Sequence, residues 1–319
     1  MATDPAVSDA NATLIARAAA AVERLLGDRI VTAEPIERGF VHDNVRARLA
    51  SGRDVLVKFP YFPRVERFER MRTMLGHLQS AGVPCAELIA DDMTGNGGEP
   101  CFILAWLPGE TLSDAWGDLS DAERDAIGHD LGTWTARLHA IQFDGVTQGD
   151  LLQRDLDRRL MLASESGLFT ASELAFAEEA IGAVAASRRE VAARAIHGDL
   201  YLDNVIISGE PGARRLAGVI DFERTVWEDP ARDFVKFRWW VFERYPELEA
   251  PLLAGYLAAG GERDTAAADS PRSRALQLIE TIAGIVYFTG RANGPYAHPN
   301  DLPMAADMRR RFDLLVAAE

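Results

Sequence analysis

The chain has 319 residues, of which 48% are hydrophobic and 26% are charged, as in ordinary globular proteins. Its formal net charge of −15 disfavours nucleic acid as a partner, because the phosphates would be repelled. The apolar runs stay well short of the roughly 20 residues that span a bilayer, and Met1 to Asp9 lacks the pattern of an export signal. We therefore expect a cytoplasmic protein without a membrane partner and, from the length, two lobes.

The negative charge is concentrated in the later part of the chain. The segment that ends at Leu104 has 14 acidic and 12 basic residues, whereas the remainder has 35 acidic and 22 basic residues. This excess is consistent with attraction of a cationic substrate, but an acidic surface that only maintains solubility would have the same composition. The composition does not decide between these two interpretations.

The first part of the chain predicts a helix followed by a small sheet. Residues 10–27 form an amphipathic pattern that ends at a glycine, which is typical of a helix and its C-terminus. Residues 64–81 repeat apolar side chains at helical spacing and predict a second helix. Short apolar runs predict strands at residues 30–36, 44–49, 54–59 and from 101 onward.

Lysine is rare in this chain. Lys58 and Lys236 are the only two lysines, against 32 arginines. Lys58 lies at the end of an apolar strand, where a compact ammonium has been kept in place of the planar arginine fork. Contact with the phosphates of a nucleotide would explain this choice. An edge-strand lysine that extends to solvent is the alternative.

The later part of the chain predicts mainly helices. Ser120 is the expected N-cap of a helix that runs to Ile141, and Glu123 completes a capping box. His139, near the end of this helix, is expected to be a hydrogen-bonded structural residue. Residues 150–195 are expected to be rich in helix, residues 234–259 and 273–289 to form further helices, and residues 260–271 to form a mobile loop.

A paired motif follows, in which His197, Asp199 and Asn204 precede an apolar strand. A turn at residues 209–212 and a second apolar strand then lead to Asp221. This spacing brings one carboxylate, one amide and a second carboxylate to the mouth of a hairpin. Such groups fit phosphoryl transfer from Mg-ATP to a hydroxyl, in which Asp199 accepts the hydroxyl proton while Asn204 and Asp221 hold magnesium.

These residues resemble the motif of the aminoglycoside phosphotransferase and choline kinase superfamily, which has a protein-kinase-like fold. Glu223 stands where a protein kinase has the glycine of Asp-Phe-Gly, which argues against a protein kinase. The segment 229–234, Asp-Pro-Ala-Arg-Asp-Phe, is similar to the family's Asp-Pro-x-x-Asp-Leu. The resemblance extends from about Ile36 to about Tyr245.

The resemblance implies an α+β, bilobal fold. A small N-terminal lobe with an antiparallel sheet would comprise residues 1–104 and bind the nucleotide. Residues 105–109 would form the hinge, where the backbone of Ala105 and Leu107 would bind adenine. Residues 110–319 would form a larger helical lobe that carries the catalytic hairpin and the acceptor pocket.

The resemblance also implies roles for other side chains. Lys58 would contact the α- and β-phosphates and would be oriented by a glutamate of the 64–81 helix, for which Glu69 is preferred and Glu66 is the alternative. His197 would brace the catalytic loop, and Asp233 would accept hydrogen bonds from its backbone. The loop at residues 38–44 would cover the phosphates.

The implied acceptor is a small molecule with a hydroxyl group, either an antibiotic such as an aminoglycoside or a metabolite such as choline, an amino alcohol or a sugar. Two other functions use the same residues. A metal-dependent hydrolase would use His197, Asp199 and Asp221 as ligands, and a kinase-like pseudoenzyme would bind nucleotide without chemistry. A cage for a quaternary ammonium could be formed by aromatic residues that otherwise belong to the core: Trp227, Trp239, Trp240, Tyr245, Tyr287 and Tyr296.

Overall fold

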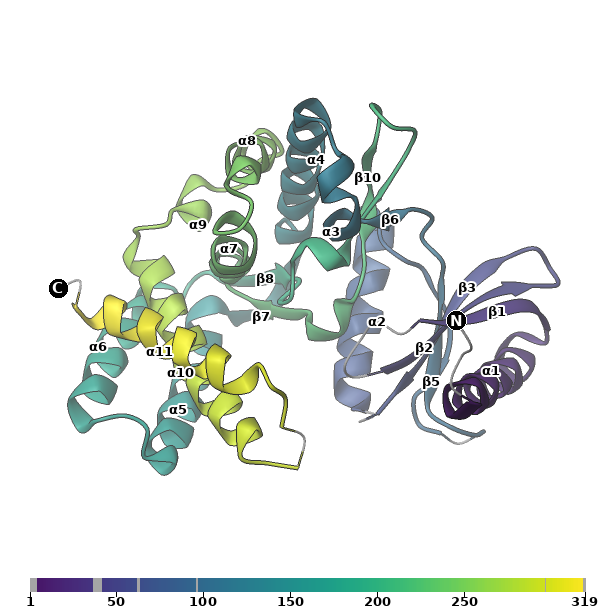
Figure 1. Ribbon diagram of the computed structural model, residues 1–319. Coiled ribbons are helices and arrows are strands. Elements are labelled where there is room, and N and C mark those ends of the chain that lie inside the picture. The colour runs from purple at the N-terminus through teal and green to yellow at the C-terminus, as the bar shows by residue number, and fades with distance from the viewer. Residues whose placement is uncertain (1–4, 37–41, 62–63, 96, 296, 318–319) are drawn as a thin grey trace. The chain divides into compact units, whose positions relative to one another are not determined.

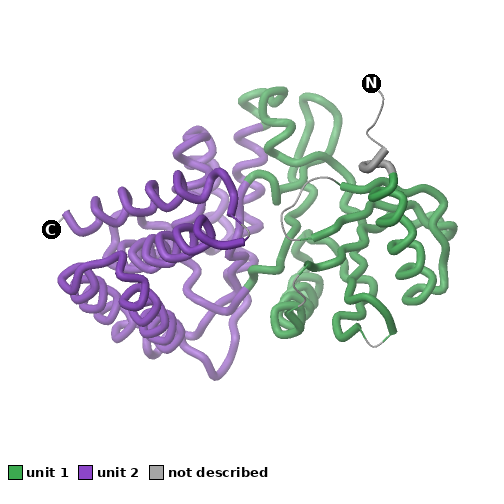
Figure 2. Tube along the Cα trace, turned by 60° about the horizontal axis from the view of Figure 1, so that its bottom comes forward, with its two compact units in different colours: residues 1–123, 202–225 green, residues 124–201, 226–319 purple. Residues whose placement is uncertain are grey.

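The computed structural model describes residues 5–36, 42–61, 64–95, 97–295 and 297–317. The chain divides into two compact units, each built from two separate segments (Figure 2). Unit 1 comprises Met1–Glu123 and Leu202–Thr225, and unit 2 comprises Arg124–Tyr201 and Val226–Glu319. The hairpin that follows the His-x-Asp motif therefore groups with the N-terminal part of the chain. The two lobes with a hinge at residues 105–109 stay a prediction.

Unit 1 contains a five-stranded sheet in the order β1-β2-β3-β5-β4. All neighbouring strands are antiparallel, and the expected strands at 30–36, 44–49 and 54–59 are present with small changes at their ends. The five strands are β1 (Ile30–Ile36), β2 (His42–Leu49), β3 (Asp54–Pro60), β4 (Leu88–Asp92) and β5 (Cys101–Ala105).

The two faces of this sheet are covered by different helices (Figure 1). Helix α1 (Pro5–Leu26) packs small side chains against one face, where Val57 of β3 is fully buried. Helix α2 (Val65–Ser80) packs on the other, with the ring centroids of Phe68 and Phe102 5.4 Å apart. Because side chains alternate along a strand, Lys58 points to the face opposite Val57 and beside its pairing partner Phe102.

A second sheet of unit 1 joins three strands in the order β10-β9-β6. These are β6 (Glu110–Thr111), β9 (Val205–Ser208) and β10 (Arg215–Val219). Gly109, just before β6, has φ of 139°, and a Cβ there would lie 2.2 Å from the carbonyl oxygen of Ile207. Only glycine allows the chain to approach β9 so closely. Helix α3 (Leu112–Ala115) follows β6.

Unit 2 combines a three-stranded sheet, in the order β11-β8-β7, with helices that bury one large apolar core. Its strands are β7 (Gln142–Thr147), β8 (Ala192–Ile196) and β11 (Val226–Glu228). The helices that supply most of the core are α5 (Gln148–Ser166), α6 (Ala171–Ser187), α10 (Pro271–Ala292) and α11 (Asp301–Ala317). The antiparallel sheet of unit 1 and the helical unit 2 confirm the predicted α+β fold class. No helix in the described ranges is both long and apolar enough to cross a membrane.

Two predictions about unit 2 were wrong in detail. The expected helix at 234–259 is broken into α7 (Ala231–Lys236), a π-helical stretch (Phe237–Phe242) and α8 (Glu249–Ala258). Pro246, which cannot donate a helical hydrogen bond, separates the last two. The expected mobile loop at 260–271 contains the short helix α9 (Arg263–Ala266), and ion pairs of Arg194 with Glu262 and of Arg272 with Asp264 hold it.

Helix α4 (Asp121–His139) begins with the predicted capping box, which the structure confirms. The Ser120 amide donates to the Glu123 carboxylate at 2.9 Å, and the Glu123 amide donates to the Ser120 hydroxyl at 3.3 Å. The same carboxylate accepts from the amides of Gly212 and Arg214 in the turn between β9 and β10. These hydrogen bonds, with those from Ser120 foremost, lower the pKa of Glu123 from 4.5 to about 2. One side chain thus fixes both the helix start and the hairpin turn.

We predict that Glu123→Gln lowers the free energy of unfolding at pH 7. The variant should also lose less stability than the wild type when the pH is lowered. The native-state pKa is depressed, so the stabilisation is complete above about 4.5 and is lost as the pH falls toward about 2. Urea denaturation should therefore give a higher free energy of unfolding for the wild type than for the variant. This difference should be constant at neutral pH and become smaller below about pH 4.5. Asp125→Asn, an exposed change on the same helix, is the control. A difference independent of pH would contradict the role given to the ionised carboxylate.

Candidate active site

Asn204 and Asp221 lie at the same end of the β9–β10 hairpin. Val205 pairs with Val219, and the amide of Ile220 donates to the carbonyl of Asn204 at 2.9 Å. Asn204 directly precedes β9 and Asp221 comes two residues after β10, so the hairpin register fixes both side chains at its mouth. An amide oxygen and a carboxylate are ligands that Mg²⁺ accepts, and this ion commonly takes one or two carboxylates and completes its shell with phosphate and water.

Asp221 has an unusual backbone conformation. Its φ of 68° and ψ of 58° place it in the left-handed region, and among the described residues it is the only non-glycine with positive φ. Such a conformation costs on the order of 1–3 kcal/mol and is concentrated at functional sites. The backbone conformation of Asp221 is an observation, independent of the motif, that agrees with the predicted functional role of this position.

Lys58 is the direct partner of Asp221. Its Nζ lies 3.2 Å from Asp221 Oδ1 and 2.5 Å from Glu223 Oε1, and only 7% of the residue is exposed. Burial disfavours the charged ammonium, but the two carboxylates outweigh it and raise the pKa of Lys58 above its usual value. His42 Nε2 contacts the other oxygen of Glu223. A lysine and two carboxylates thus form one charged cluster in unit 1.

The partner of the lysine differs from the one expected. Glu69 and the alternative Glu66 are exposed, and in the described part of the chain neither carboxylate is paired with Lys58. Glu223 pairs with Lys58 because it follows Asp221 by two residues, on the short 3₁₀ helix that packs against α2. The Asp-Phe-Glu sequence could have indicated this pairing, because it places a second carboxylate two residues after Asp221. Its glutamate had been interpreted only as evidence against a protein kinase. A nucleotide-binding role for Glu69 stays a prediction.

The expected hinge residues also belong to unit 1. Ala105 ends β5, and its amide donates to the carbonyl of Glu87 at 2.8 Å. The side chain of Leu107 lies against Gly218 of β10, where a Cβ would be 3.0 Å from Leu107 Cδ2. Of the loop expected over the phosphates at 38–44, residues 38–41 lie outside the described part of the chain.

The His-Gly-Asp loop is held in unit 2 by a buried carboxylate. Asp233 accepts hydrogen bonds from the amides of His197 at 2.9 Å and Gly198 at 2.8 Å, and contacts His139 Nε2 at 3.2 Å. Burial would raise the pKa of Asp233, but the hydrogen bond from His139 and the nearby histidines hold it below its usual value. The Asp199 amide in turn contacts His197 Nδ1 at 3.3 Å. The backbone that carries Asp199 is therefore fixed from two sides.

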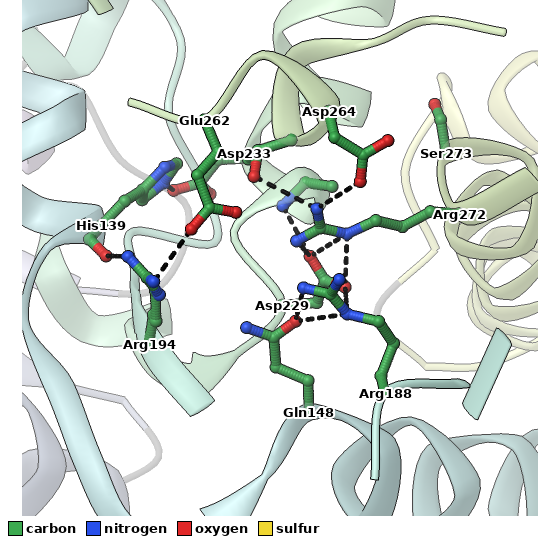
Figure 3. A network of polar contacts seen from close by, with 12 residues as sticks. His139, Gln148, Arg188, Arg194, Asp229, Asp233, Glu262, Asp264, Arg272 and Ser273 are labelled. Atoms are coloured by element: carbon green, nitrogen blue, oxygen red, sulfur yellow. Dashed lines mark hydrogen bonds and ion pairs between the residues drawn. The ribbon is translucent and has the colours of Figure 1, made fainter. Parts of the chain in front are cut away.

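The segment that supplies Asp233 is itself anchored by ion pairs (Figure 3). Asp229 binds Arg272 through both oxygens and accepts from the amide of Ala231, which fixes the start of α7. Arg272 also reaches Asp264, which fixes the 260–271 segment. The two aspartates of Asp-Pro-x-x-Asp thus have separate tasks: the first anchors the helix, and the second anchors the His-Gly-Asp loop.

Comparison with known proteins identifies the family. A family model for the phosphotransferase enzyme family matches residues 32–269. The chain belongs to this family. It is thus a phosphotransferase, as the resemblance of its motifs to the aminoglycoside phosphotransferase superfamily predicted. No curated protein sequence matches the chain.

Solved structures with a similar fold include several antibiotic phosphotransferases. ADP-bound aminoglycoside phosphotransferase APH(2'')-Ib has a TM-score of 0.63 at 17% identity, covering 94% of this chain and 97% of that one. The GDP and kanamycin complex of APH(2")-IIia has a TM-score of 0.64 at 17% identity, covering 95% and 99%. The macrolide 2'-phosphotransferase MphH from Brachybacterium faecium has a TM-score of 0.60 at 16% identity, covering 93% and 97%. At such identities the likeness establishes the fold of this phosphotransferase.

We predict that Asp233→Ala strongly destabilises the protein. The substitution leaves the two loop amides and His139 without their buried acceptor, and each unsatisfied donor costs about 1–3 kcal/mol. The free energy of unfolding should be measured by urea denaturation. Asp157→Ala, which removes an exposed carboxylate from α5, serves as the control. A decrease of less than about 1 kcal/mol in the free energy of unfolding would contradict this prediction, because it would mean that water replaces the carboxylate as the acceptor at little cost.

Proposed function

We propose that this phosphotransferase transfers the γ-phosphate of ATP, with Mg²⁺, to a hydroxyl of a small molecule that carries amino groups. The observation that carries the proposal is the cluster at the hairpin mouth. A buried lysine there contacts a strained aspartate, Asp221, next to the amide residue Asn204. That combination supplies one cation for phosphates and two oxygen ligands for a metal ion.

The nucleotide side of the reaction uses residues of unit 1. The phosphates would replace Asp221 and Glu223 as partners of Lys58, which releases Asp221 to bind the metal. Asn204 and Asp221 would hold Mg²⁺, and their hard oxygen donors fit this ion. Bound magnesium would neutralise charge on the phosphate oxygens. The backbone of Ala105 and Leu107 would bind the adenine.

The acceptor side uses the loop held by Asp233. Asp199 would take the proton of the acceptor hydroxyl as the oxygen of that hydroxyl bonds to the γ-phosphorus. The bond between this phosphorus and the bridging oxygen of ADP breaks in the same step, so ADP leaves with the bonding electron pair. The rigid backbone around Asp199 favours this role, because a base must be positioned before it can act.

The proposed acceptor class rests on charge and on the similar structures. Complexes of those proteins contain gentamicin, kanamycin and streptomycin. In this chain, the carboxylates nearest the motif are already paired: Glu223 with Lys58, Glu228 with Arg232 and Asp229 with Arg272. The attraction of a cation would therefore come from the net charge of the later segment and act over distance.

The aromatic residues considered for an ammonium cage have other partners. Trp239 belongs to the apolar core of unit 2, and Trp227 stacks on Phe143 with ring centroids 4.9 Å apart. Tyr296 lies outside the described residues. These positions give a cage no support beyond the sequence.

The hydrolase alternative would need a group of three His, Cys, Asp or Glu side chains that could hold a metal ion. The described residues contain no such group.

We predict that variants of the two aspartates fail in different ways. Asp199→Asn should lower turnover by about 10²–10⁴-fold and leave Mg-ATP affinity nearly unchanged, because the lost group acts on the acceptor. Asp221→Ala should lower both, because the metal and its phosphates lose a ligand. Asn204→Ala should resemble Asp221→Ala with a smaller effect, since a neutral amide attracts the metal less. Nucleotide titration and ATP turnover measure both quantities. Equal losses of affinity and turnover in Asp199→Asn would contradict its role as the base.

We also predict that the preferred acceptor is a cation whose binding weakens with salt. ATP consumption should be screened with kanamycin, gentamicin, streptomycin, choline and ethanolamine, and with glucose and glycerol as neutral controls. The KM of the best acceptor should rise between low and physiological ionic strength, because salt screens exposed charges. The KM of Mg-ATP should change less, since specific ligands hold it. A neutral molecule as the best acceptor would show that the acidity is only a surface property.

A further inference from the structure

The second lysine of the chain lies beside the other proposed reactive carboxylate. Lys236 Nζ is 3.9 Å from Asp199 Oδ1, and the two side chains are 16% and 23% exposed. Lys58 has the corresponding position beside Asp221. In a chain with 32 arginines, both lysines therefore contact a carboxylate of the proposed chemistry.

Helix α7 presents three charged side chains to three different targets. Asp233 binds the backbone of the His-Gly-Asp loop, and Lys236 reaches the carboxylate of Asp199 on the same loop. Arg232, four residues before Lys236, pairs with a group of carboxylates formed by Asp155, Glu228 and Glu280. The position of the Lys236 ammonium relative to Asp199 is thus set by the helix that fixes the loop.

The charge of Lys236 also acts on a second carboxylate, that of Glu280. Glu280 of α10 is only partly exposed, and burial would raise its pKa, but Arg232 and Lys236 hold that pKa at about 2. Lys236 therefore interacts with an ionised carboxylate on α10 as well as with Asp199.

We propose that Lys236 is a positioning residue that acts through Asp199, holding its carboxylate oriented toward the acceptor hydroxyl. The inference rests on the proposed function, since it assumes that Asp199 is the base. At 3.9 Å the contact between Lys236 and Asp199 is an ion pair without a hydrogen bond. A lysine suits this place because it is a compact charge, whereas the arginine fork would bind both oxygens.

The test is a double-mutant cycle between Lys236 and Asp199. Lys236→Met should lower kcat by about 10–100-fold, which is part of the roughly 10²–10⁴-fold that a positioned base contributes, with little change in the KM of Mg-ATP. Lys236→Arg keeps the charge, so its kcat should exceed that of Lys236→Met, but it should stay below that of the wild type because the fork engages both carboxylate oxygens. In the Asp199→Asn background, Lys236→Met should cause no further loss, because its effect requires the base. Arg244→Met removes an exposed cation nearby in the chain and is the control.

Two assays make the cycle independent of the acceptor: turnover with the best molecule from the screen, and slow hydrolysis of Mg-ATP, in which water is the acceptor. Thermal unfolding of each variant detects loss of fold. Additive losses in the double variant, or full activity of Lys236→Met while Asp199→Asn is impaired, would overturn the role of Lys236 alone. Unimpaired turnover of Asp199→Asn would remove the proposed base and this inference with it.

Discussion

The ion pairs of Lys58 with Asp221 and Glu223 join parts of unit 1 that lie far apart in the sequence. Lys58 and Asp221 are separated by 163 positions, yet their side chains meet in a largely buried place. A buried ammonium is costly unless carboxylates compensate it, so Lys58 depends on Asp221 and Glu223. The sheet face that carries Lys58 and the hairpin that carries Asp221 are therefore linked by a polar requirement as well as by packing.

Arginine and lysine have different uses in this protein. Arginines pair with carboxylates that hold the fold, as Arg272 does with Asp229 and Arg232 does with Glu280. Their planar forks bind two oxygens at once and suit fixed arrangements. The two lysines lie beside Asp221 and Asp199 instead. A point charge on a flexible stem can change partners, which is what a site that admits phosphates would need.

Local sequence signals predicted most of the elements, and long-range contacts explain the errors. The β1 strand and the Ser120–Glu123 capping box depend on neighbouring residues, so their patterns could be read directly. The pairing of Lys58 with Glu223, instead of Glu69, depends on how the hairpin packs against α2, and periodicity carries no such information. The ordered 260–271 segment likewise depends on the ion pair of Glu262 with Arg194, 68 positions away. The charge pattern could not show that Glu228 and Asp229 are already paired, because their partners are fixed by the tertiary fold.

The division of each unit into two segments has a consequence for how the protein is made. The first 123 residues leave the ribosome without β9 and β10, the strands that complete their second sheet. Unit 1 cannot close until residues 202–225 have been synthesised, and by then the first segment of unit 2 is already present. During that interval Lys58 has neither Asp221 nor Glu223 as a partner, and the sheet face around Lys58 lacks the segment that later packs near it. Nascent chains of this kind expose unfinished surfaces for longer than chains whose domains are continuous, and they depend more on chaperones.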